Sequence, residues 1–89
     1  DEEFKFKVVA RRNKLLGLWA ADLMKITGDD ADAYAKQVVV SDFDEPGDDD
    51  VLRKVLCDLQ AKGASQDKTS IRRQMDRLLE EAKHQLAAE

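Results

Sequence analysis

The sequence predicts an all-α fold, a small four-helix bundle with a long N-terminal helix. Apolar residues recur at helical spacing in four segments, and glycine or proline lies in the short breaks between these segments. The run Val38–Val40 has strand propensity, but it is short and has no partner run elsewhere, so we expect it to be helical. A length of 89 residues fits one domain, and we expect residues 1–89 to form it.

The first expected helix runs from about residue 2 to residue 26. Its apolar stripe consists of Val8, Leu15, Trp19, Leu23 and Ile26. The acidic residues 1–3 suit the positive end of a helix dipole, and Thr27 with Gly28 should end the helix, because glycine accepts a left-handed conformation. Such a helix exceeds what a small bundle needs, so its first turns should project from the body or fray. Trp19 is the best single candidate for a core anchor.

The second and third expected helices lie on either side of a break at Pro46 and Gly47. The second helix starts near Asp29 or Asp30, either of which can cap it, and continues to about Phe43. The third begins in the acidic run 48–50, which supplies a cap and a favourable first-turn charge, and ends near residues 62–63. Its apolar stripe comprises Leu52, Val55, Leu56 and Leu59.

The fourth expected helix begins within Ser65–Ser70 and has the most regular amphipathic pattern in the chain. Its apolar stripe comprises Ile71, Met75, Leu78, Leu79, Ala82 and Leu86. Because the connections between the four helices are short, sequential neighbours should pack antiparallel.

The residues do not indicate an enzyme, a metal site or a cofactor. The one histidine, His84, lies off the apolar stripe of its helix, where we expect it to face solvent. The lone cysteine, Cys57, is expected to be a small buried or half-buried apolar residue. The acidic segment 42–50 resembles a calcium loop, but Pro46 and Arg53 occupy two positions where oxygen ligands are needed. The four glycines form no phosphate-binding loop.

Composition narrows the classes of partner. A single cysteine excludes an intrachain disulfide and fits a reducing cytoplasm, and no apolar run is long enough to span a membrane. A net charge of −4 disfavours nucleic-acid binding. Within this acidic chain, residues 1–14 carry five basic and three acidic groups, whereas residues 29–50 carry nine acidic groups and one lysine. A basic strip next to an acidic one indicates a protein partner with a complementary surface.

The basic strip is the most suggestive feature of the sequence. It consists of Lys5, Lys7, Arg11, Arg12 and Lys14, and Phe4 and Phe6 interleave with it. Arginine can make bidentate contacts with carboxylates or phosphates of a partner. The same strip can equally be a solvated helix face whose lysine and arginine stems cover apolar core groups. The spacing of the residues leaves both interpretations open.

Four segments of the chain carry a family resemblance. Residues 10–21 read ARRNKLLGLWAA, residues 33–39 read AYAKQVV, residues 42–51 read DFDEPGDDDV and precede Arg53-Lys54, and residues 71–76 read IRRQMD. The first segment strongly resembles the signature of the zeta subunit family of alphaproteobacterial F-type ATP synthases, and the others agree with it in the right order. Each motif alone would be weak, but their joint occurrence over almost the whole chain is specific.

The resemblance implies a four-helix protein that inhibits ATP hydrolysis by the catalytic head of the synthase and largely spares synthesis. In that family the N-terminal segment inserts between alpha and beta subunits, beside the central stalk, and blocks rotation. The implied partners are therefore the alpha, beta and central-stalk subunits. The implied location is the cytoplasm, at the inner face of the cell membrane when bound to the synthase, without direct membrane insertion. We expect the free chain to be a monomer.

The family also has a further N-terminal stretch, rich in charged residues and Phe, before the position of Asp1. The resemblance therefore marks residues 1–7 as the remnant of an inhibitory arm and residues 8–89 as the bundle, and it implies weak inhibition by this chain. It assigns partner contact to Phe4, Phe6, Lys7, Arg11 and Arg12. Two other classes stay open, a helical adaptor with an unrelated protein partner and a weak nucleotide-binding protein with a pocket between helices.

Overall fold

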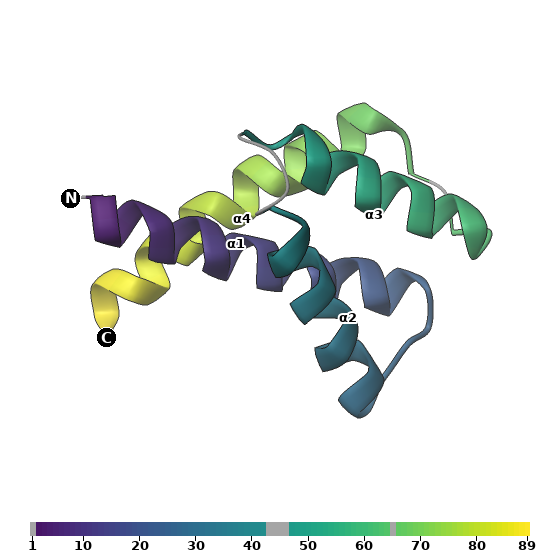
Figure 1. Ribbon diagram of the computed structural model, residues 1–89, viewed down its shortest axis with the longest axis horizontal. Coiled ribbons are helices and arrows are strands. Elements are labelled where there is room, and N and C mark those ends of the chain that lie inside the picture. Colours follow the sequence, from purple (N-terminus) through teal and green to yellow (C-terminus); the bar gives the residue numbers. More distant parts are fainter. Residues whose placement is uncertain (1, 43–46, 65) are drawn as a thin grey trace.

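The computed structural model describes residues 2–42, 47–64 and 66–89, and these residues form four helices and no strand (Figure 1). The helices are α1 (Glu2–Leu23), α2 (Gly28–Ser41), α3 (Asp49–Ala61) and α4 (Lys68–Ala88). The predicted all-α fold with a long N-terminal helix is confirmed. The valine run 38–40 lies inside α2 and is helical as expected.

The first helix, α1, is the centre of the bundle. It makes its most extensive contacts with α2 and with α4, whereas α3 contacts each of the other helices less extensively. α1 and α4 lie side by side and run in opposite directions, so the two ends of the chain lie at the same end of the molecule (Figure 1). The first turns of α1 are therefore near the last turns of α4.

The buried surface of α1 differs from the predicted apolar stripe. The buried residues of α1 are Val8, Arg12, Asn13, Leu16, Gly17, Ala20 and Ala21. Most of the predicted stripe, including Trp19, is only partly buried against the core, so the expectation that Trp19 anchors the core is wrong. Leu16 has that role, since its side chain is fully buried. Both α2 and α4 pack against α1, so more than one face of α1 is buried. The buried residues include small ones, which allow the helices to approach closely.

Gly17 shows how close that approach is. A Cβ atom placed on Gly17 would lie 2.6 Å from the Cα of Ala35 and 3.2 Å from a methyl carbon of Val38. Carbon atoms in contact normally lie about 3.5–4.0 Å apart, so no side chain fits between the two helices here. The glycine therefore fixes the crossing of α1 over α2.

Two helices end in the same capping motif. At the end of α3, Gly63 takes a left-handed conformation (φ 71°), the Gly63 N–H donates to the Gln60 carbonyl, and the Ala64 N–H donates to the Leu59 carbonyl. This motif satisfies carbonyls that the helix leaves without an internal partner, and it matches the predicted end of the third helix.

The end of α1 differs from the prediction. Lys25, not Gly28, takes the left-handed position (φ 61°), and the helix ends at Leu23. The Lys25 N–H donates to the Asp22 carbonyl (3.1 Å) and the Ile26 N–H donates to the Ala21 carbonyl (2.8 Å). This earlier end lets Ile26 pack against the core, which offsets the strain of a left-handed lysine.

The helix starts are only partly as predicted. α2 begins one residue before the expected caps, and its N-cap is Thr27, whose side chain makes no capping bond; the acidic residues 29 and 30 lie in the first turn instead. Asp48 is the N-cap of α3, also without a side-chain capping bond. Its carboxylate is engaged by Arg12 instead. Asp67 caps α4 by accepting the Ser70 N–H at 2.7 Å.

The apolar stripes of α3 and α4 fill the rest of the core much as predicted. Leu59, Ile71 and Met75 are among its largest fully buried side chains. Burial of side chains of this size contributes roughly 1.5–3 kcal/mol each. Across residues 2–42, 47–64 and 66–89, no helix is both long and apolar enough to cross a membrane.

Candidate partner-binding surface

The first turns of α1 lie outside the core. Residues 2–7 are all exposed, and Val8 is the first buried residue of the helix. Phe4 is 39% exposed and Phe6 is 59% exposed. Residues two positions apart in an α-helix point about 200° apart, so the two rings lie on opposite sides of the helix. An exposed helical segment with aromatic rings on both sides can make apolar contacts with a partner that surrounds it.

Lys7 forms a weak ion pair with Glu3. Its ammonium lies 3.5 Å from the Glu3 carboxylate one turn earlier, and both side chains are largely exposed. Exposed pairs of this kind contribute at most about 0.5 kcal/mol, so a partner carboxylate could replace Glu3 at little cost.

Arg11 ties α1 to the end of α4. Its guanidinium donates to the Gln85 side-chain oxygen at 2.8 Å and to the Glu89 carboxylate at 2.7 Å. The arginine is half-buried and the glutamate is exposed. Arg11 could reach a partner only by giving up these two contacts.

Arg12 has a different environment from its neighbour. It is only 2% exposed, and its guanidinium donates to both carboxylate oxygens of Asp48, at 2.7 and 3.5 Å, and to the Asn13 side-chain oxygen at 2.8 Å. The guanidinium of Arg12 thus joins α1 to the start of α3 through a bidentate contact with Asp48. The basic strip therefore divides: Arg12 serves the fold, whereas Lys5, Lys7 and Lys14 are exposed.

The acidic groups around Arg12 include Asp42, the C-cap of α2. Burial raises the pKa of Asp42 above its ordinary value, and the nearby Asp48 and Asp50 raise it further. The amide of Asn13 and the positive charge of Arg12 oppose this increase in the pKa. Arg12 therefore holds the carboxylate at the start of α3, and the buried amide nitrogen of Asn13 makes no hydrogen bond with any described residue.

Other residues considered in the sequence are on the surface. His84 is exposed, as predicted. Cys57 is also exposed, so the expectation that it would be buried or half-buried is wrong. The calcium-loop comparison falls largely on residues 43–46, which lie outside the described residues. Among the residues that the structure describes, no group of His, Cys, Asp and Glu side chains is arranged to hold a metal ion.

The comparisons with known proteins agree with the fold and the motifs. The family model for ATPase inhibitor subunit zeta matches residues 1–85. The chain belongs to the ATPase inhibitor subunit zeta family. A structure solved by solution NMR superposes on this zeta-family chain with a TM-score of 0.84; the two sequences are 46% identical, over 94% of this chain and 95% of the other. The search of curated proteins returned no match.

Membership of an inhibitor family indicates a regulatory role for this zeta-family chain rather than a catalytic one. It confirms the family predicted from the sequence. Partner contact by Phe4, Phe6, Lys7, Arg11 and Arg12 stays a prediction. The structure places the first three on the exposed turns, Arg11 in contact with α4, and Arg12 inside the bundle.

Asn13 is the polar residue that the sequence analysis missed. It is buried on α1 beside Arg12 and accepts a hydrogen bond from that arginine. The available signal was its position: an asparagine one turn after Val9 and one turn before Gly17 lies on the helix face toward α2, where a polar side chain needs a partner.

Proposed function

We propose that this chain inhibits ATP hydrolysis by the F-type ATP synthase by lodging the first turns of α1 in the catalytic head and blocking rotation. The observation that carries the proposal is the exposed helical segment of residues 2–7, with Phe4 and Phe6 on opposite sides, continuous with a helix that is buried from Val8 onward. Family membership supports the inhibitory role.

The proposed inhibition is steric and involves no catalytic step. With its side chains, the exposed helical rod of residues 2–7 is about 10–12 Å across, narrow enough to enter a cleft between subunits. The rest of α1 is held by α2 and α4, so the rod cannot bend freely at its base. The bundle is too wide to follow it and acts as a stop. A wedge of this kind inhibits because it stabilises one rotational state of the machine over the others.

The side chains have separate parts in this proposal. Phe4 and Phe6 supply apolar contacts, and Lys7 exchanges Glu3 for a carboxylate of the head. Arg11 joins the interface if it releases Glu89 and Gln85. Arg12 acts indirectly by fixing the bundle behind the rod. The partners are the alpha, beta and central-stalk subunits, and the place of action is the cytoplasmic side of the membrane.

The test is the rate of ATP hydrolysis by purified synthase at increasing concentrations of the chain. The double variant Phe4→Ala/Phe6→Ala should raise the concentration for half-inhibition about tenfold or more, because buried aromatic anchors dominate interfaces. The matched control is Gln60→Ala/Lys62→Ala, two exposed positions in the last turn of α3 and at its C-cap. Equal inhibition by wild type, control and double variant would contradict the proposal.

A further inference from the structure

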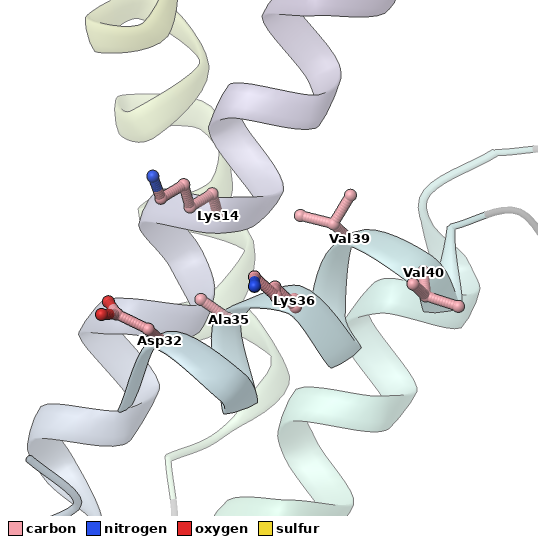
Figure 2. Close-up of a pocket in the computed structure, with 6 residues that line it drawn as sticks. All are labelled: Lys14, Asp32, Ala35, Lys36, Val39 and Val40. Atoms are coloured by element: carbon pink, nitrogen blue, oxygen red, sulfur yellow. The ribbon is translucent and has the colours of Figure 1, made fainter. Parts of the chain in front are cut away.

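A second surface, which meets the first turns of α1 at Phe6, lies where α1 and α2 meet. A hollow of about 530 Å³ opens between them. Lys14 of α1 and five residues of α2 line it: Asp32, Ala35, Lys36, Val39 and Val40 (Figure 2). Its volume lies within the roughly 300–1,000 Å³ that ligand sites occupy. None of the residues that line this first hollow is among the five to which the family resemblance assigns partner contact.

The hollow continues toward the arm. A second hollow of about 430 Å³ shares Lys14 and Val39 with the first and extends to Phe6, and a third, smaller one also lies between Phe6 and Val39. Together they form a furrow, the α1–α2 furrow, which runs from Asp32 along both helices to Phe6. Phe6 therefore belongs both to the furrow and to the exposed turns of α1.

The floor of the furrow is apolar. Ala35 lies one turn before the adjacent pair Val39 and Val40 on α2, and Val40 is 58% exposed. Among the described residues, Val40 and Phe6 are two of the three large apolar side chains that are exposed, and both line the furrow. An apolar strip at helical spacing fits the apolar face of another helix.

At its first hollow, the rim of the furrow carries an excess of positive charge. In the described part of the chain, neither Lys14 nor Lys36 makes an ion pair or a side-chain hydrogen bond, although both lie at its edge. One carboxylate, Asp32, lines the same hollow. The chain as a whole has a net charge of −4, so this rim is a local reversal of sign. Charge of this kind orients a partner and selects one of opposite sign.

We propose that the α1–α2 furrow is a second contact with the synthase, and that it holds an acidic amphipathic helix of the catalytic head. Apolar side chains of that helix lie on Val39 and Val40, and its flanking carboxylates accept hydrogen bonds from Lys14 and Lys36. The inference rests on the proposed function for the choice of the synthase as partner. It adds an interface that the arm does not provide.

The lining favours a helix over a nucleotide. Every residue of the first hollow lies in the interior of α1 or α2, where backbone N–H groups are already used within the helix. A phosphate would therefore find two lysines but no helix N-terminus, and a base would find only aliphatic side chains. An amphipathic helix uses both the floor and the rim.

A second contact would change the behaviour of the arm. The furrow and the arm share the same rigid helix, so a partner held in the furrow keeps the arm close to its cleft. The second binding event then becomes intramolecular and proceeds at a high effective concentration. An arm that binds weakly on its own can inhibit under these conditions.

The test measures binding of the labelled full chain to the purified catalytic head by fluorescence anisotropy. Val40→Asp places a carboxylate on the floor and should weaken binding about tenfold or more, because that charge would be buried without a partner. Lys36→Glu should weaken binding and reduce its dependence on salt. The matched control is Arg73→Glu, an exposed position on α4 that forms no ion pair with any residue the structure describes. Its affinity should equal that of wild type.

The inference and the proposed function fail differently. If Phe4→Ala/Phe6→Ala inhibits as well as wild type, the arm mechanism is wrong, while a loss of binding in Val40→Asp and Lys36→Glu still supports the furrow. Both furrow positions are exposed, and unchanged urea midpoints would verify that the variants fold. Unchanged affinity in both folded furrow variants would overturn the inference whatever the arm does.

A photo-crosslinker at position 40 identifies what occupies the furrow. The expected product joins the chain to a helical peptide of the catalytic head that carries Asp or Glu beside its apolar face. A product joining two copies of the chain, or loss of the product on adding adenine nucleotide with no binding to the head, would overturn the inference.

Discussion

The two parts of α1 differ in what surrounds them. Residues 2–7 are exposed, although Phe6 and Lys7 also line a hollow beside α2 and α4, whereas residues 8–23 pass between α2 and α4 and bury residues on successive turns. No break in the helix marks the change. One continuous helix therefore has an end available to a partner and a body that holds the fold. Substitutions at the buried positions of the body should change stability, and substitutions in the exposed end should change mainly binding.

The largest effect should come from the tightest contact of the body. Gly17→Val places a branched side chain where even a Cβ would lie 2.6 Å from the backbone of Ala35. We expect a loss of about 3 kcal/mol in the free energy of unfolding, at the upper end of the usual range for overpacking. Urea unfolding followed by circular dichroism measures it.

Ala33→Val on the exposed face of α2 is the control for Gly17→Val, because it adds a branched side chain to a helix without a clash. It should cost about 0.5 kcal/mol, the ordinary helix-propensity difference. A Gly17→Val variant no less stable than this control would show that α2 can move away from α1, and the body would not be rigid.

The next largest effect separates two adjacent arginines. Arg12→Ala removes a buried guanidinium and its bonds to Asp48 and Asn13, and we expect a loss of about 2 kcal/mol. Loss of a buried ion pair can cost about 3–5 kcal/mol, but the Asp48 side chain is 43% exposed, so water can solvate the carboxylate that remains.

Arg11→Ala provides the comparison at the neighbouring position. It removes a half-buried pair with Glu89 and should cost at most about 1 kcal/mol. Equal losses in thermal unfolding for the two variants would mean that burial of Arg12 contributes nothing, and the division of the basic strip would be wrong.

The existence and type of the four helices could be predicted from the sequence, because apolar periodicity reports which faces are buried. The end of the first helix could not. Gly28 had the residue type expected at a helix end, but packing of Ile26 places the end three residues earlier, at Lys25. That choice depends on a tertiary contact, which local sequence does not contain.

The candidate site was predictable only in its exposed part. The exposure of Phe4, Phe6 and Lys7 could be predicted, because the first helix is longer than its bundle needs. The buried role of Arg12 depends on Asp48, 36 residues away in sequence, and on the path that brings the start of α3 back to α1. The furrow likewise requires the crossing of α1 and α2, which Gly17 allows but does not specify.

A smaller effect, and a stabilising one, should come from the junction after the body of α1. Lys25→Gly removes the strain of a left-handed lysine, about 1–2 kcal/mol, but adds freedom to the unfolded chain. We expect a net gain of about 0.5–1 kcal/mol and a rise of a few degrees in Tm.

Lys62→Gly is the matched control for Lys25→Gly, since this lysine follows α3 with a φ of −95°. Without strain to relieve, it should be neutral or slightly destabilising. If both variants were stabilising, or neither, the left-handed lysine would not be the reason for the gain.

The smallest effect on stability should come from the exposed end. Lys7→Ala breaks only the pair with Glu3, so the free energy of unfolding should change by less than about 0.5 kcal/mol. Its effect on the synthase should be separate: a slower association and a weaker dependence of inhibition on salt, as expected for a charge at the rim of an interface. Stopped-flow inhibition at two salt concentrations and urea unfolding measure the two effects. A loss of stability as large as that of Arg12→Ala would place residues 2–7 within the part of the helix that holds the fold, and the difference between the two parts of α1 would disappear.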